Sequence, residues 1–187
     1  EIVYGLNMLF TNATPLGGFT TEYTNVGSGK FLGLSYLVWI ALVVAAITWF
    51  IFNMTRHGKY MYAIGGNPQA AEVAGVPVKA TMILIYMKAA AMYGLAGFML
   101  GAKAGGASVN LGYGYEMEAI AACTIGGVSV TGGRGKVSSA IIGVAVFELL
   151  KAALQYLGVD ANAQYIAIGI VIFVAISLDI RKYVAKK

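Results

Sequence analysis

Five charged side chains lie in or beside long apolar runs, and these are the residues best placed to do chemistry: Lys88, Glu116, Glu118, Glu148 and Lys151. Charges inside a membrane are costly and often mark the path of an ion or a substrate. Glu148 and Lys151 are three residues apart, so a local ion pair is expected. Glu116 and Glu118 stand near the edge of their run, where either water or a transported molecule could reach them. Lys88 lies deeper and could extend only partly to the surface.

No enzyme signature accompanies these charges. The chain has one cysteine, Cys123, and one histidine, His57, so neither a metal site nor a bound cofactor is expected. The run Gly132–Lys136 resembles a phosphate-binding loop, but Val130 and Val137 occupy the positions where that motif needs glycine and Ser or Thr. Any nucleotide hydrolysis must therefore be done by another chain.

The composition indicates a protein that lies in a membrane. Hydrophobic residues make up 59% of the chain and charged residues 11%, whereas a soluble domain has about 25% charged residues. Glycine is abundant, at 25 of 187 residues, as in membrane helices that pack closely. The net charge of +5 does not indicate nucleic-acid binding, because the basic residues stand at the ends of apolar runs.

Apolar runs predict an all-α integral membrane fold with about five transmembrane segments. The first has 22 residues and no charge, so as a helix it would be about 33 Å long, enough for one crossing. The third is short, and Gly126-Gly127 interrupts it. Residues 1–30 are polar and are predicted to be a loop with little regular structure. The predicted segments are Phe31–Phe52, Thr81–Ala102, Glu116–Val130, Val137–Leu157 and Ala163–Leu178.

The distribution of basic residues favours five crossings with the C-terminal tail in the cytoplasm. In that arrangement only Lys30 and Lys103 lie outside. If the third segment were instead re-entrant, the split would be three basic residues inside and eight outside, or the reverse. The chain begins without methionine, so it is expected to be the later part of a longer protein. The nine basic residues then placed inside are Arg56, Lys59, Lys79, Arg134, Lys136, Arg181, Lys182, Lys186 and Lys187.

A short helix over Pro68–Ala74 is predicted within the polar stretch Asn53–Lys79. Asn67 suits the N-cap of this helix, proline its first turn, and Gly75 its C-terminal end. Its side chains are mostly small, so it could seat closely in a groove on a partner protein. A connecting turn at the membrane surface is the alternative, and the residues alone do not choose between the two.

The motifs of this loop and of the later segments resemble those of sugar importer permeases of the ABC type, the ribose and galactose class, and most of all its galactose/methyl-galactoside branch. The resemblance covers nearly the whole chain. Met117 and Glu118 stand where the family leads us to expect Leu and Asp, and Lys88 is not a residue associated with the family. The matching stretches are Arg56–Pro68, continuing through Ala71, Ala74 and Gly75, then Gly114–Ala122, Ile125–Ser129, Gly132–Gly135 and Gln164–Asp179.

The resemblance implies one permease domain over residues 1–187, with a periplasmic loop at 1–30 and a cytoplasmic coupling loop at 53–79. It also implies partners: a cytoplasmic ATPase, a periplasmic sugar-binding protein, a second permease subunit forming a homodimer, a monosaccharide and membrane lipid of the bacterial inner membrane. The alternative is an ion-coupled secondary transporter. Contact with the ATPase would fall to Asn67, Pro68, Gln69, Ala70, Ala71, Glu72, Ala74 and Gly75, and the translocation path to Tyr115, Glu116, Glu118, Gly126 and Gly127.

Overall fold

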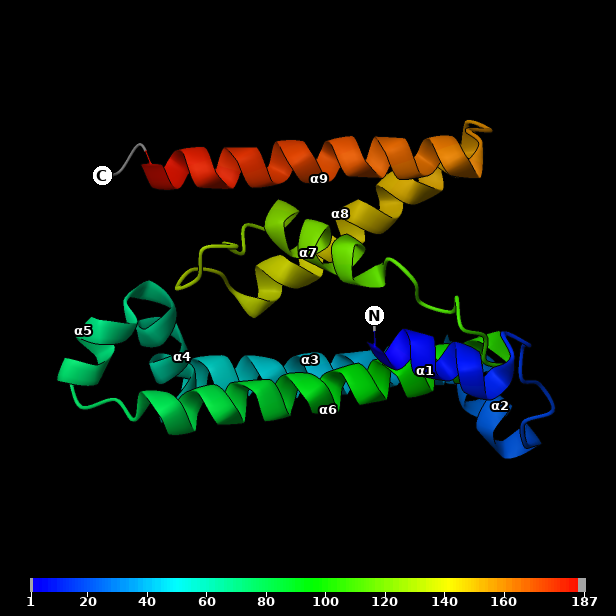
Figure 1. Ribbon diagram of the computed structural model, residues 1–187, viewed down its shortest axis with the longest axis horizontal. Helices are drawn as coiled ribbons and strands as arrows, with labels where there is room; N and C mark the ends of the chain where they lie inside the picture. The colour runs from blue at the N-terminus through cyan, green and yellow to red at the C-terminus, as the bar shows by residue number, and fades with distance from the viewer. Residues whose placement is uncertain (1, 185–187) are drawn as a thin grey trace. The chain divides into compact units, whose positions relative to one another are not determined.

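The structure is a computed structural model that describes residues 2–184, without the side chains of residues 161–162, 178–179 and 182–184. Helices dominate it (Figure 1). In the described part the only strands are β1 (Lys30–Phe31) and β2 (Leu34–Ser35), which form a two-residue antiparallel hairpin. The predicted all-α class is therefore confirmed. The helices are α1 (Ile2–Thr11), α2 (Thr21–Ser28), α3 (Tyr36–Met54), α4 (Arg56–Gly66), α5 (Pro68–Val73), α6 (Val78–Ala104), α7 (Tyr115–Ile125), α8 (Val137–Tyr156) and α9 (Ala161–Val184).

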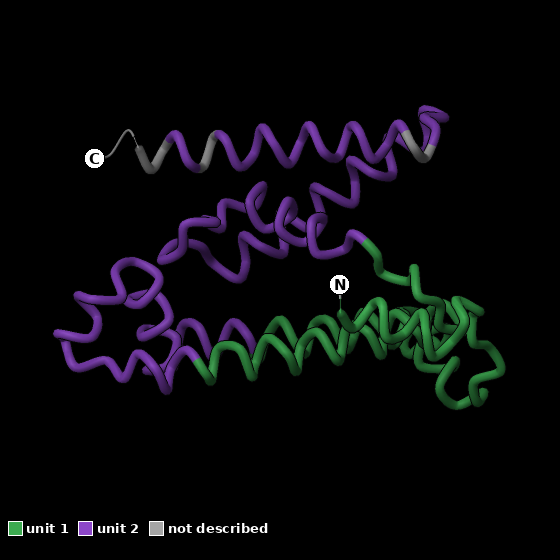
Figure 2. The backbone as a smooth tube through the Cα atoms, viewed as in Figure 1, with its two compact units in different colours: residues 1–47, 83–113 green, residues 48–82, 114–187 purple. Residues whose placement is uncertain are grey.

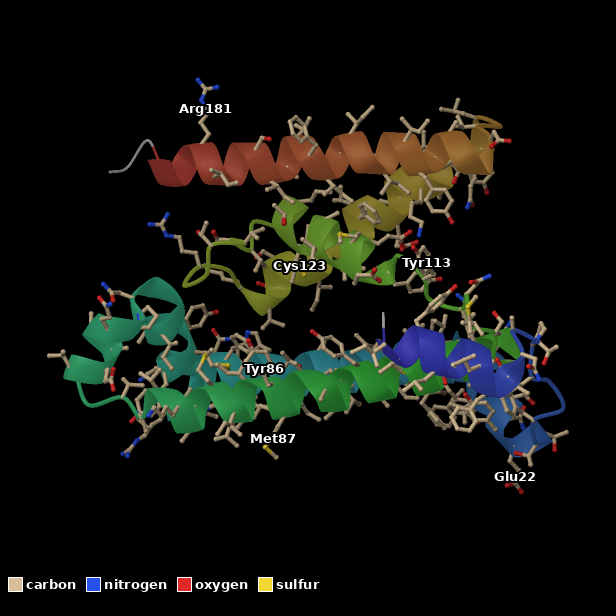
Figure 3. The ribbon with its side chains drawn as sticks, viewed as in Figure 1. Glu22, Tyr86, Met87, Tyr113, Cys123 and Arg181 are labelled. Atoms are coloured by element: carbon tan, nitrogen blue, oxygen red, sulfur yellow. The ribbon has the colours of Figure 1, made fainter. Side chains whose placement is uncertain are left out.

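Three of these helices, α3, α6 and α8, are long and apolar enough to cross a membrane, judged by length and composition. No residue of α3 is buried within the chain. On α6, Tyr86 and Met87 project away from the helix (Figure 3), and they are 69% and 61% exposed. Such helices need lipid or other protein around them, which agrees with the predicted membrane class. The predicted last crossing falls within α9, and Lys186 and Lys187 of the basic tail lie outside the described residues.

The predicted third crossing is only partly helical. Helix α7 begins after Gly114 and ends at Gly126, and Gly127 follows with a positive φ of 85°. Eleven residues give a helix about 16 Å long, too short to cross a bilayer by itself. The expectation that the glycine pair breaks this segment is confirmed, and the rest of it, from Gly126 to Val130, is not helical.

Two loop predictions need correction. The stretch 1–30, predicted to have little regular structure, contains α1 and α2. Apolar residues fill most of α1, and Glu22 lies in the first turn of α2, where a negative charge favours a helix. The stretch 53–79 contains α4 as well as the predicted short helix. The signal for α4 is Thr55, whose hydroxyl accepts a hydrogen bond from the Gly58 amide as an N-cap.

The chain divides into two compact units, residues 1–47 with 83–113 (unit 1) and residues 48–82 with 114–187 (unit 2), shown in Figure 2. Unit 2 holds a hydrophobic core in which α7 packs against α8 and α9 through Ala121, Ala122, Phe147 and Ile168. A glycine permits the closest approach, since a Cβ at Gly143 of α8 would overlap the Ala122 carbonyl. Cys123 (Figure 3) is half-buried on α7.

In unit 1 the N-terminal segment joins the segment that follows α6. Leu16 and Ala107 form an isolated β-bridge, with N–H···O distances of 2.7 and 2.8 Å. The Tyr23 hydroxyl donates to the Phe98 carbonyl at 2.8 Å, and the two rings pack edge to face. The positioning of α1 and α2 therefore depends on residues 75 and 91 positions later in the chain, which explains why local patterns in 1–30 gave no helix prediction.

Candidate functional site

The short helix α5 has the N-terminal cap that the sequence predicts. The Asn67 side-chain oxygen accepts hydrogen bonds from the backbone amides of Gln69 and Ala70, both at 3.0 Å. Pro68 occupies the first turn, where its missing N–H costs nothing. Two of the otherwise unpaired amides at the start of the helix are thus satisfied, so a helix of six residues is held in place.

The other end of α5 is closed by a Schellman motif. Gly75 donates to the Glu72 carbonyl at 2.9 Å, and Val76 donates to the Ala71 carbonyl at 3.0 Å. Gly75 has a φ of +83°, in the left-handed region that disfavours residues with a Cβ. The predicted role of Gly75 at the C-terminal end is confirmed, with the helix ending one residue earlier than expected, at Val73.

One face of α5 is buried and the rest is exposed. Ala71 is 4% exposed, whereas Val73 is 91% exposed. Gln69, Ala70, Glu72 and Ala74 are exposed too. The exposed Val73 lies beside small and polar side chains. This side of α5 therefore protrudes little, and a groove of another protein could cover it.

Helix α4 positions α5, and it does so directly. Asn67 is both the C-cap of α4, donating its amide to the Ala63 carbonyl at 3.0 Å, and the N-cap of α5. The end of α4 lies against the loop between α7 and α8, because the Tyr62 hydroxyl donates to the Gly135 carbonyl at 2.8 Å. The sequence did not lead us to predict this contact of Tyr62. The glycine pairs at 65–66 and 132–133 were the features that could have indicated a close approach of the two segments.

A charged cluster joins α7 to α8. Lys151 Nζ lies 2.7 Å from Glu118 Oε2 and 3.8 Å from Glu148 Oε1. It also lies 6.0 Å from the centroid of the Tyr115 ring, within reach of a weak cation–π attraction. The predicted local pair with Glu148 is present, but the shorter contact is with Glu118, on the other helix. Glu118 is therefore engaged in holding α7 on α8.

The remaining predicted path residues differ in their surroundings. Tyr115 is 51% exposed, and Glu116 is exposed and forms no ion pair with any residue that the structure describes. Gly126 lies against α8, since a Cβ there would overlap the Ser139 carbonyl, while Gly127 serves the turn. The structure thus places both acidic residues on the first turn of α7 and gives the two glycines structural roles.

Lys88 lies on the long helix α6. It is half-buried on α6, and within the described residues it forms no ion pair.

A cavity of about 250 Å³ lies in unit 1 beside the Leu16–Ala107 bridge. Its lining comes from α1 and from the two segments that the bridge joins: Asn7, Thr11, Thr14, Leu16, Ala107, Ser108, Val109 and Leu111. The hydroxyls of Thr11 and Thr14 donate to backbone carbonyls nearby. The cavity is thus polar in part and belongs to the segments predicted to lie outside.

Residues 3–176 match the protein family described as "Branched-chain amino acid transport system / permease component". The chain belongs to this family. It is 42% identical to the galactose/methyl galactoside import permease protein MglC of Escherichia coli K12, a match that covers 100% of the chain and 57% of that protein. It is 36% identical to the ribose import permease protein RbsC of Bacillus subtilis, covering 95% of the chain and 56% of the relative.

The match to the MglC protein of Treponema pallidum has 37% identity over the whole chain and 36% of that relative. The chain therefore spans little more than half the length, or less, of the curated relatives it matches. No solved structure matches it. Membership of a permease family agrees with the all-α membrane fold and with a place in the bacterial inner membrane, as predicted.

Proposed function

We propose that this chain is part of the membrane permease subunit of an ATP-driven, binding-protein-dependent importer for a monosaccharide of the galactose/methyl-galactoside or ribose class. The family description names amino acids, whereas the similar curated proteins are named as sugar permeases. The proposed substrate class follows these proteins, because their identity of 34–42% extends over 95–100% of the chain. The higher identity to the galactoside permeases favours galactose over ribose.

The observation that carries the proposal is α5, a short helix fixed at both ends with its outer side exposed. A permease that catalyses no hydrolysis must receive the energy of ATP through contact with an ATPase. The residues proposed to contact the ATPase are Asn67, Pro68, Gln69, Ala70, Ala71, Glu72, Ala74 and Gly75. Of these, Ala71 is buried and packs α5 against the rest of this chain. The exposed Val73 joins this surface.

The five-crossing topology is supported by the contact of α4 with the loop 126–136. A re-entrant third segment would return to the side from which it entered, which would separate this loop from residues 53–79 by the whole bilayer. The hydrogen bond from Tyr62 to Gly135 supports a topology with both stretches on one side. Both stretches are basic, with Arg56, Lys59 and Lys79 in one and Arg134 and Lys136 in the other, so this side is proposed to be cytoplasmic.

The opposite side is proposed to receive the periplasmic binding protein. The segments 1–30 and 105–115, both placed outside by the charge distribution, are joined by the Leu16–Ala107 bridge. A docking protein would therefore meet one surface built from both segments. The translocation path is proposed to pass α7, where Tyr115 and Glu116 offer a ring and a carboxylate to sugar hydroxyls, with a second copy of the subunit forming the other half.

The test is sugar uptake by the full subunit in proteoliposomes together with the ATPase and the binding protein. Labelled galactose is expected to enter only with ATP present, and faster than labelled ribose. Uptake driven by a proton or sodium gradient without ATP would support the ion-coupled alternative instead. A failure to bind the ATPase in detergent would also overturn the proposal, because α5 would then have no partner.

A further inference from the structure

Two glycine pairs in unit 2 meet backbone to backbone. A Cβ added at Gly65, near the end of α4, would lie 2.5 Å from the amide nitrogen of Gly133. A Cβ at Gly132 would lie 2.8 Å from the Gly65 carbonyl oxygen, and one at Gly133 would lie 2.7 Å from the Gly66 amide nitrogen. Real Cβ atoms do not approach other atoms so closely, so the contact exists only because Gly65, Gly132 and Gly133 carry no side chain. We call these three residues the glycine junction.

A second contact braces the glycine junction. The Tyr62 hydroxyl, one turn earlier on α4, donates to the Gly135 carbonyl at 2.8 Å. The ring of Tyr62 packs edge to face on Phe52 of α3, with centroids 5.9 Å apart. Gly135 has a φ of 141°, a conformation that a residue with a Cβ rarely adopts. The loop and α4 are thus attached at two adjacent points.

On one side of the glycine junction, α4 continues into α5 without a linker. Gly65 and Gly66 are the last two residues of α4, and the next residue, Asn67, caps both helices. A displacement of α5 must therefore move the glycine junction, because the Asn67 side chain holds the first amides of α5.

On the other side, the loop 126–136 is short and internally bonded. The Ser129 amide donates to the Arg134 carbonyl at 3.1 Å, which closes the loop on itself. The loop starts at Gly126, the C-cap of α7, and ends at Lys136, the N-cap of α8. Gly126 also packs directly on the α8 backbone at Ser139. Movement of the loop should therefore also displace the C-terminal end of α7.

We propose that the glycine junction transmits movement of α5 to α7, so that the state of the ATPase changes the position of the helix that carries Glu116. A contact between backbones has no rotatable side chain to absorb a displacement, unlike a contact made by long side chains. The proposal rests on the proposed function, since it takes α5 as the ATPase contact. Gly65, Gly132 and Gly133 are then positioning residues for transport.

Two neighbouring glycines provide a matched test. Gly65 and Gly66 both lie in the last turn of α4 with ordinary helical backbone, but a Cβ at Gly66 would meet nothing within 4 Å. Alanine at either position favours the helix, so only the clash with Gly133 distinguishes them. In proteoliposomes holding the full subunit, the ATPase and the binding protein, Gly65→Ala is expected to lower sugar uptake per ATP hydrolysed by about tenfold, a typical coupling effect. Gly66→Ala is expected to leave this ratio unchanged.

Three readouts separate the possible outcomes. If the unsubstituted complex takes up no sugar with ATP, or if the ATPase does not copurify, it is the proposed function that fails. That failure is distinct from a failure of the glycine junction to transmit movement. The inference is overturned if the Gly65→Ala subunit binds the ATPase, has unchanged thermal stability, and shows the same sugar uptake per ATP hydrolysed as Gly66→Ala. The glycine junction would then transmit nothing.

A gentler variant covers the case in which Gly65→Ala does not fold. Tyr62→Phe keeps the ring that packs on Phe52 and removes only the hydrogen bond to Gly135. The uptake per ATP is expected to fall about fivefold, the equivalent of one lost hydrogen bond. An unchanged ratio in this folded variant would likewise overturn the inference.

Discussion

Lys151 of α8 and Glu118 of α7 form an ion pair with 2.7 Å between the ammonium nitrogen and a carboxylate oxygen. Both side chains are largely buried, at 22% and 21% exposure, whereas the second partner, Glu148, lies at 3.8 Å and is 62% exposed. The pair fixes the position of the short helix α7 along α8. Glu116 lies in the same first turn of α7 as Glu118, so the ion pair joins α7 to α8 close to that carboxylate.

Removing one partner of this pair is expected to destabilise the subunit. Glu118→Gln leaves Lys151 without its nearest counter-charge, and the free energy of unfolding should fall by about 2 kcal/mol. Removing the ammonium as well, by combining Glu118→Gln with Lys151→Met, should restore part of the loss. The measurement is thermal unfolding of the purified subunit in detergent.

Glu148→Gln is the matched control for the ion pair. The exposed contact of Glu148 is expected to contribute less than about 1 kcal/mol. If Glu148→Gln destabilises the subunit as much as Glu118→Gln does, the short contact between Lys151 and Glu118 is not the main source of this stability.

The two acidic residues of α7 are expected to respond differently to loss of charge. Glu116→Gln should lower the rate of sugar uptake without changing thermal stability, because Glu116 is exposed and pairs with no cation in the described part of the chain. Glu118→Gln should lower both. Equal uptake by Glu116→Gln and the unsubstituted subunit would indicate that Glu116 is only solvated at the membrane surface.

The sequence predicts those features that depend on neighbouring residues. The cap at Asn67, the turn at Gly75 and the break at Gly126-Gly127 each follow from one residue type in one backbone position, and all three are present. The apolar runs likewise predicted the long helices, since one membrane crossing needs a fixed length of apolar chain.

Features that join distant parts of the chain were not predictable in this way. Glu118 and Lys151 are 33 residues apart, and only the packing of α7 on α8 brings them together. Glu148 was the nearer candidate by helical spacing. Helices α1 and α2 were missed because Thr, Asn and Gly in 1–30 favour loops locally, and tertiary contacts such as Tyr23 with Phe98 override that preference.

The cap of α5 gives a prediction about binding of the ATPase. Asn67→Ala removes both side-chain hydrogen bonds to the first amides of α5 and should destabilise this helix by about 1 kcal/mol. Less ATPase should then copurify with the subunit. Asn67→Asp keeps an acceptor oxygen in the same place and should bind the ATPase almost normally. Equal loss in both variants would point to a role of the Asn67 amide group other than capping.

The turn after α5 gives a prediction about coupling. Gly75 has a φ of +83° and open space around it, so a β-branched residue there is strained although nothing collides with it. Gly75→Val is expected to shift the end of α5 and to let ATP hydrolysis continue while sugar uptake falls. Gly75→Asn, which tolerates this backbone conformation better, should retain most uptake. Normal uptake by Gly75→Val would remove the coupling role from this end of the helix.

The topology can be tested with single cysteines in a Cys123→Ala background. Gln69 and Thr131 are exposed and belong to the two stretches proposed to be cytoplasmic, while Thr14 and Ser108 are exposed in the two stretches proposed to be outside. A thiol reagent that cannot cross the membrane should label Gln69→Cys and Thr131→Cys only in inverted vesicles. It should label Thr14→Cys and Ser108→Cys only in vesicles of native orientation.

The decisive comparison is between Gln69 and Thr131. Five crossings place these two residues on the same side of the membrane, whereas a re-entrant third segment places them on opposite sides, whichever side residues 53–79 occupy. Thr131 lies in the loop whose Gly135 carbonyl accepts the bond from Tyr62, so labelling on the side of Gln69 is required by that bond. Labelling of Gln69→Cys and Thr131→Cys from opposite sides would contradict five crossings. It would also exclude the glycine junction in the membrane, because Gly65 and Gly133 would then lie on opposite faces of the bilayer.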